Sequence, residues 1–337
     1  MYIPKLHTAE LGGLMMSNLR AGYKEDFPGT AHKIELPRPS LALQTDVLQP
    51  PGLRDGENVV PYIKYSLLMS VSTKQALYSA ANVDLDKTKK VPSRRGRNWF
   101  IDRRVGRDNQ ISNYPYQGSL WDRGHLTRRT AVTWGSGVDD ATKASNDSCA
   151  YTNACMQHKN FNEDDWRTVE ELVAKFKKEK KLTVITGPIF TKSDRYYTRE
   201  FEDYPVRIPS GFWKILSYVG EDNNLKTQGY VFFQDLPSIK NSKARSRIRL
   251  KDMQVTTTEI SLWTGLEFDP ILFDTNPLKF YSGPEVITIK ERKKLLTKNP
   301  DTLELDAGIV SETSVANARE EFPLEDFYEL IAEVSWV

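Results

Sequence analysis

One histidine among arginines is the first feature of this sequence that points to chemistry. His125 stands in the segment WDRGHLTRRT, and Arg123, Arg128 and Arg129 lie close to it in the chain. Nearby positive charge disfavours the protonated imidazole, so we expect a neutral ring that can accept a proton, as a general base must. Taken alone, the segment also fits a structural turn, because an Asp-Arg pair beside a glycine is common at tight corners.

A second polar segment, YTNACMQHKNFNEDDWRTVEELV, lies further along the chain. Over residues 162–181 an apolar stripe at helical spacing, acids at the start and lysines at the end predict an amphipathic helix. Asn162 occupies its N-cap position, and Glu170 lies on a neighbouring azimuth further along the same helix. On the residues alone, Asn162 is therefore a candidate helix cap.

Together the two segments resemble the DNA/RNA non-specific endonuclease family, the ββα-metal (His-Me finger) nucleases that include bacterial sugar-non-specific nucleases and mitochondrial endonuclease G. The resemblance extends upstream to RGRNW and downstream through TGPIF, IPSGFWK and TEISLWTGLEF. It implies an α+β fold with a central antiparallel sheet and flanking helices. The activity it implies is Mg²⁺-dependent hydrolysis of phosphodiester bonds in DNA and RNA with little sequence specificity.

The same resemblance implies a role for each matching residue. His125 would deprotonate the attacking water, and Asn162 would be the only direct protein ligand of one Mg²⁺, with Mn²⁺ as a substitute. Glu170 would hold metal-bound waters. Arg123 and Arg97 would bind phosphate oxygens. Asp122 would support the strand that bears His125, and Asn153 would help orient the site.

Two positions depart from the family pattern. Met156 stands where a proline usually precedes the glutamine matched by Gln157, and Ala174 stands where some members carry an arginine. Arg128 or Arg129 is a candidate to supply that missing charge.

The organisation of the chain predicts one endonuclease domain between two extensions. Residues 1–57 are expected to form an N-terminal arm, 58–275 the endonuclease domain and 276–337 a C-terminal extension. Strands are expected at 59–72, 75–84, 183–190, 213–219 and 229–233, and a short apolar run at 149–155. A second helix is expected near the C-terminus, where Phe327, Leu330, Ile331 and Val334 recur at helical spacing.

Charge is unevenly distributed along the chain. Residues 84–129 carry twelve Lys or Arg against five Asp, with Trp99, Phe100 and Trp121 interleaved, which suits the phosphate backbone of DNA and RNA as a partner. A solvated basic loop is the alternative. Residues 301–337 carry ten acids against Arg319 alone. The terminal extensions leave open a homodimer, a regulatory partner or autoinhibition.

Composition excludes several other classes of protein. The chain has 337 residues, 39% hydrophobic and 27% charged, with no apolar stretch long enough to span a membrane and no signal-peptide pattern. We therefore expect no membrane partner and a cytoplasmic location, with secretion by another route left open. Two cysteines, Cys149 and Cys155, cannot form a structural zinc site and are expected to be packed thiols. The alternative functions are a nucleic-acid-binding homologue with weak catalysis and a nuclease effector regulated through its extensions.

Overall fold

The computed structural model describes residues 20–29, 31–89, 91, 98–176, 180–192, 194–198, 205–234, 250–276 and 278. Arg97, the expected C-terminal helix around Phe327 and the acidic segment 301–337 lie outside the described residues. The proposals that depend on them therefore stay predictions.

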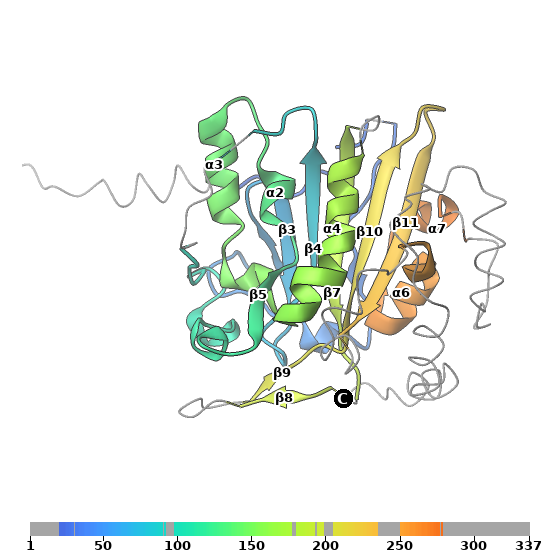
Figure 1. Cartoon of the computed structure of the whole chain (residues 1–337). Coiled ribbons are helices and arrows are strands. Elements are labelled where there is room, and N and C mark those ends of the chain that lie inside the picture. Colours follow the sequence, from blue (N-terminus) through green and yellow to red (C-terminus); the bar gives the residue numbers. More distant parts are fainter. Residues whose placement is uncertain are drawn as a thin grey trace, which may run out of the picture.

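A seven-stranded antiparallel sheet forms the centre of the molecule (Figure 1), in the order β12-β11-β10-β7-β4-β3-β2. Its strands are β2 (Val59–Pro61), β3 (Tyr65–Met69), β4 (Ala76–Asp84), β7 (Lys181–Ile189), β10 (Gly211–Val219), β11 (Leu225–Phe233) and β12 (Gln254–Val255). The three long central strands β4, β7 and β10 are buried along almost their whole length, as expected of strands covered on both faces. The predicted α+β fold with a central antiparallel sheet is confirmed.

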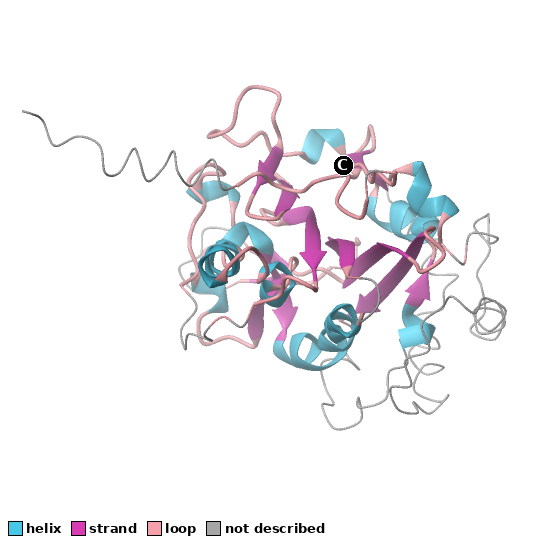
Figure 2. Cartoon of the chain, turned by 90° about the horizontal axis from the view of Figure 1, so that it is seen from above, coloured by secondary structure: helices cyan, strands magenta, loops and turns pink. Residues whose placement is uncertain are grey.

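Two apolar cores cover the two faces of this sheet, and Figure 2 shows helices on both sides of the strands. One core includes residues of α2 (Arg129–Val132), α3 (Val138–Asp147) and α4 (Trp166–Lys175). The other includes residues of α6 (Thr257–Thr264) and α7 (Pro270–Asp274). Helix α2 packs on β4 and α6 packs on β7 and β11, whereas α3 packs on α2 and α7 packs on α6.

The described part of the N-terminal arm packs against the same sheet. Tyr23 and Ile34 belong to the core that contains α6 and α7, and the amide of Gly22 donates to the carbonyl of Tyr62 at 2.9 Å. The short strand β1 (Arg38–Pro39) pairs with β13 (Leu266–Glu267). The domain boundaries at 57/58 and 275/276 stay predictions.

The strand expected at 59–72 is two strands, so that prediction is wrong in detail. Lys64 adopts a φ of 72°, and the chain turns there between β2 and β3. The Lys64 ammonium lies 4.3 Å from the centre of the Trp134 ring and 3.6 Å from Asp140 Oδ1, contacts that hold the unusual backbone conformation in place.

Two further short strands, β8 (Tyr196–Tyr197) and β9 (Val206–Arg207), form a separate hairpin. None of the helices in the described ranges has the length and apolar character needed to cross a membrane.

Candidate active site

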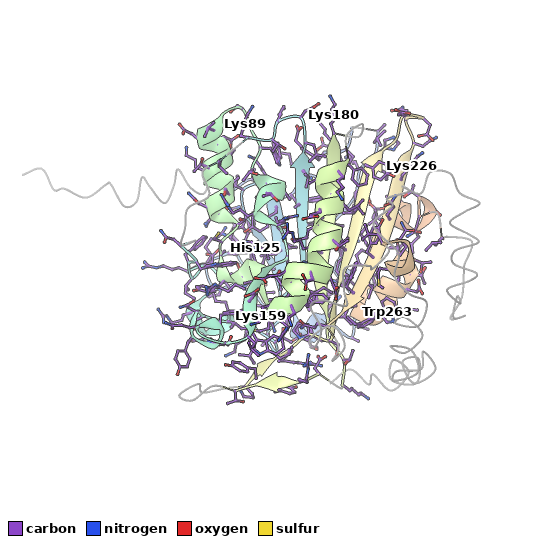
Figure 3. The ribbon with its side chains drawn as sticks, in the orientation of Figure 1. Lys89, His125, Lys159, Lys180, Lys226 and Trp263 are labelled. Atoms are coloured by element: carbon purple, nitrogen blue, oxygen red, sulfur yellow. The ribbon has the colours of Figure 1, made fainter. Side chains whose placement is uncertain are left out.

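The predicted catalytic residues are carried by a β-hairpin followed by a helix. Strand β5 (Trp121–His125) pairs antiparallel with β6 (Ala154–His158), so that His125 faces Ala154 and Asp122 faces Gln157. A π-helical turn, Phe161–Asp165, then leads into α4. We call β5, β6, this turn and α4 the finger; Figure 3 labels His125 on it.

Gly124 is required by the close approach of the two finger strands. A Cβ added at Gly124 would lie 2.1 Å from Oε1 of Gln157, whose side chain is fully buried. A larger residue at this position would have to displace the buried Gln157 side chain. The glycine between Arg123 and His125 is therefore set by packing, and the chemistry belongs to its neighbours.

Two buried glutamines attach the outer edge of β6 to the rest of the domain. Oε1 of Gln75 accepts from the amide of Met156 at 3.1 Å, and Oε1 of Gln234 accepts from the amide of His158 at 3.0 Å. Gln234 Nε2 also donates to the carbonyl of Met156 at 3.1 Å. These bonds satisfy an edge that no strand of the described residues covers. A proline at position 156 would have no N–H to donate. The methionine that replaces the usual proline of the family therefore makes the bond to Gln75 possible.

His125 lies in a nearly closed environment at the end of β5. His125 is only 8% exposed, and the centre of its ring lies 4.6 Å from the centre of the Trp99 ring. Nε2 lies 3.9 Å from Sγ of Cys149, which is also buried. The sequence places Trp99 in the basic segment and predicts Cys149 to be a packed thiol. It does not indicate that both side chains contact His125.

Arg123 shares the same aromatic wall. Its guanidinium carbon lies 5.6 Å from the centre of the Trp99 ring, and Nη1 donates to Oδ1 of Asn113 at 2.8 Å. Guanidinium stacked on an aromatic face keeps its charge while its N–H groups stay directed outward. The structure thus brings Arg123 and His125 into contact with the same tryptophan ring.

Asn162 contacts Asp122 and does not cap a helix. It lies inside the π-helical turn, no side-chain cap bond is formed there, and α4 begins four residues later at Trp166, so the N-cap prediction is wrong. Nδ2 of Asn162 donates to Oδ2 of Asp122 at 2.9 Å. Because a carboxylate only accepts hydrogen bonds, this contact fixes the amide with its carbonyl oxygen pointing away from Asp122.

The helix predicted at 162–181 is correct in its centre and too long at both ends. Its apolar stripe, including Trp166 and Val169, is buried as expected. The helical segment ends at Lys175, and Lys181 already belongs to β7.

Asn153 is fully buried and holds the chain that leaves β5. Its Oδ1 accepts from the amide of Thr127, and its Nδ2 donates to the carbonyls of Thr127 and Ser148, all at 2.9 Å. Its own carbonyl accepts from the amide of Leu126 at 3.0 Å. These bonds fix the backbone directly after His125.

Glu170 faces a cluster of cations over the sheet. Its Oε2 lies 3.4 Å from Nε of Arg128, one of the two arginines that the sequence offered as substitutes for the one missing at Ala174. The neighbouring Lys214, 2% exposed, donates from Nζ to Oγ1 of Thr186 at 2.8 Å and lies 4.8 Å from the Trp166 ring centre. Burial lowers the pKa of Lys214 to about 8, and the charge of Glu170 opposes that shift. Sequence reasoning missed Lys214, because a lysine inside a strand carries no signal of its partners.

The residues present fit a hydrated magnesium ion. Among the described residues, no three His, Cys, Asp or Glu side chains are grouped as a metal cage would require. The Asn162 carbonyl oxygen, oriented away from Asp122, is a donor of the kind that Mg²⁺ accepts when water fills its remaining positions. Glu170 is a nearby carboxylate suited to binding such waters. Arg97 lies outside the described residues, so the structure does not place it.

Comparisons with known proteins agree on one family. The sequence profile of the DNA/RNA non-specific endonuclease family matches residues 47–274. An uncharacterized protein of Sinorhizobium fredii, y4fB, is 27% identical over 290 residues, which are 79% of this chain and 41% of that protein. Human mitochondrial endonuclease G is 23% identical over 213 residues, 61% of this chain and 67% of its own length. The solved structure of the EndoG/EndoGI complex matches with a TM-score of 0.51 and 19% identity, covering 65% of this chain and 86% of that one.

Proposed function

Because the chain belongs to the DNA/RNA non-specific endonuclease family, we propose that it is a Mg²⁺-dependent endonuclease that hydrolyses phosphodiester bonds in DNA and RNA with little sequence specificity. The observation that carries this proposal is the finger. It places His125 on β5, and through Asp122 on the same strand it holds Asn162 at the entrance to α4. A base and a metal-binding oxygen are thus tied to one rigid element.

His125 is the general base of the proposed reaction. It takes a proton from the water that attacks phosphorus, and the bond from phosphorus to the leaving oxygen breaks. Trp99 and Cys149 hold the ring, and Asn153 holds the backbone behind it. Arg123 binds non-bridging phosphate oxygens through its guanidinium, and Arg97 is assigned the same task from the family resemblance alone.

Asn162 holds the ion in this proposal. Asp122 orients its amide, and Glu170 binds waters of the hydration shell while Arg128 keeps the Glu170 carboxylate in place. A Mg²⁺ ion held by these residues would supply positive charge to stabilise the charge that develops during cleavage, and Mn²⁺ is expected to substitute. The proposal assigns these residues to phosphate, metal and water, and contacts of that kind carry no sequence information, which supports the proposed low sequence specificity.

Digestion of two nucleic acids tests the proposal. Plasmid DNA and a structured RNA are incubated with the purified chain in Mg²⁺, in Mn²⁺ and in excess EDTA, beside His125→Ala purified in the same way. We expect cleavage of both substrates with either metal, none in EDTA, and recovery when Mg²⁺ is added back. Undiminished cleavage in EDTA would overturn metal dependence, and equal activity in the His125→Ala preparation would reveal a contaminating nuclease.

A further inference from the structure

A cavity of about 390 Å³ lies between α2 and α4. Its floor is the face of the sheet formed by β4, β7 and β10, with Val83, Val184 and Lys214 among the lining residues. The α4 wall includes Val173, Ala174 and, just beyond the helix, Phe176. Volumes of roughly 300–1,000 Å³ are typical of pockets that hold small organic ligands.

One end of this cavity, called the near end, borders the candidate active site. Arg128 and Glu170, the ion pair described above, both line it, and so does Thr127, which follows His125 by two residues. Oγ1 of Thr127 lies 2.7 Å from Oγ of Ser79, so this end is anchored to β4.

The lining combines an apolar wall with cations. Arg128 and Lys214 stand at the near end, and Lys180 stands at the far end, where its ammonium pairs with Asp86 at 2.8 Å. Figure 3 shows Lys180 beyond His125, toward the upper ends of β4 and α4. Two carboxylates, Asp86 and Glu170, face three cations, and most of the remaining lining side chains are aliphatic or aromatic. An apolar body with an attached anion fits such a surface.

Lys214 is the part of the lining that packing does not explain. A lysine that is 2% exposed loses its hydration, and its ammonium has three N–H donors, of which the contact with Thr186 uses one. Its position beside Arg128 and Glu170 directs a second positive charge to the near end of the cavity. A phosphate oxygen would complete the coordination of this ammonium.

We propose that the cavity between α2 and α4 is a nucleotide subsite, which takes one unstacked nucleotide of the substrate strand beside the scissile phosphate. Its base and sugar lie against Val173, Phe176 and Val184, and its phosphate lies between Arg128 and Lys214. This inference rests on the proposed endonuclease activity and goes beyond it. A base held between two helices has left its stack, so single strands, which lose little by unstacking, are the preferred substrate.

The test fills the cavity from α4. Ala174→Phe places a ring into the cavity from an exposed position on the helix, while Glu171→Phe places the same ring on the same helix outside the cavity lining. The substrates are single strands with one cleavable phosphodiester, intact or lacking the base on either side of it, and the matching duplex. Thermal unfolding of each variant reports folding.

Three results are expected. The wild type has a higher kcat/KM for the single strand than for the duplex. Removing the base on one side of the cleavable bond lowers kcat/KM about tenfold or more, in line with the roughly 1–3 kcal/mol measured for base contacts of this kind. Ala174→Phe should show the same loss of kcat/KM on the intact strand, and removal of the base should lower its kcat/KM no further. Glu171→Phe should behave as the wild type on every substrate.

The subsite is refuted if removal of the base on either side changes the wild-type kcat/KM by less than twofold, or if Ala174→Phe equals the wild type on every substrate. If Ala174→Phe does not fold, Lys214→Met takes its place, and a KM for the intact strand equal to that of the wild type refutes the phosphate contact. Absence of any cleavage by the wild type would instead refute the proposed function. The subsite is then tested by binding of the intact and base-lacking strands, where equal Kd values refute it.

Discussion

The helices α4 and α6 begin in opposite ways. At α6 the hydroxyl of Thr256 accepts from the amide of Glu259 at 3.0 Å, and the Glu259 carboxylate accepts from the amide of Thr256 at 2.7 Å. That helix ends at Gly265 with a φ of 66°. At α4 neither end has such a device, and the helix is entered through a π-helical turn. Local capping rules are satisfied at α6 and are not satisfied at α4, where the entrance holds Asn162 of the proposed site.

The surroundings of α6 are apolar, whereas those of α4 include buried charged groups. Ile260 of α6 packs into an apolar core with Leu272 of α7. Trp166 of α4 is equally buried, but it lies against the ammonium of Lys214, and Glu170 one turn later pairs with Arg128. The α4 side of the sheet therefore buries charged groups that the α6 side lacks in its core, and burial of an ion costs stability.

The largest effect expected on the α4 side is loss of the base. His125→Ala should lower kcat by roughly 10²–10⁴-fold, the usual contribution of a general base, with binding to an uncleaved strand retained. Steady-state kinetics and a binding titration measure this, with His32→Ala, outside the finger, as the matched histidine control. A His125→Ala enzyme within about tenfold of the wild type would remove the residue from the mechanism.

Loss of the metal ligand should follow in size. Asn162→Ala is expected to lose at least the roughly 10–100-fold typical of a partner behind a metal ligand, and raised Mg²⁺ or Mn²⁺ should restore part of it. Its melting temperature in EDTA should stay close to that of the wild type, since the structure gives the side chain no capping bond. A large loss of stability together with metal affinity equal to the wild type would instead support a structural role.

The buried charge on the α4 side should appear in the pH dependence of stability. The pKa of Lys214 is about 8 in the folded chain and 10.5 for a free lysine, so between these values the unfolded chain binds more protons. The wild type should therefore gain stability as pH rises from 8 to 10.5, by up to about 3 kcal/mol relative to Lys214→Met, and show no such relative change below pH 8. Denaturant unfolding of both proteins across this range measures it. Parallel curves throughout would show that burial does not lower the pKa of Lys214 in the folded chain.

The smallest effect belongs to the α6 side. Thr256→Ala should cost about 0.5–2 kcal/mol of unfolding free energy, the usual value of a lost cap, and leave kcat and KM unchanged. Comparison with Asn162→Ala sharpens the contrast between the helices, since each variant should change only one of the two quantities. If Thr256→Ala lowers activity as well, the two faces of the sheet are coupled.

Most of the secondary structure and the chemically active residues follow from the sequence. Alternation and helical periodicity are local properties, so the strands around 79, 184 and 216 and the centre of α4 were predicted correctly. Errors arose where a single residue overrides the pattern, as at Lys64, whose left-handed conformation divides one predicted strand into two. The end of α4 was also misplaced, because lysines suit the last turn of a helix and the start of a strand equally well.

The sequence by itself determined the DRGH segment, Asn162, Glu170 and the α+β fold, since residue type and short-range spacing encode them. Only the tertiary structure decided what each of them contacts. Gln75 and Gln234 contact residues of β6 that are 81 and 76 positions away in the chain. Lys214 lies on β10, which follows α4 in the chain, and its charge interacts with that of Glu170 on α4. The tertiary structure also showed that Asn162, predicted to cap a helix, is hydrogen-bonded to Asp122. A cap is a contact within a few residues of one helix, whereas the bond across 40 residues exists only once β5, β6 and α4 have packed together.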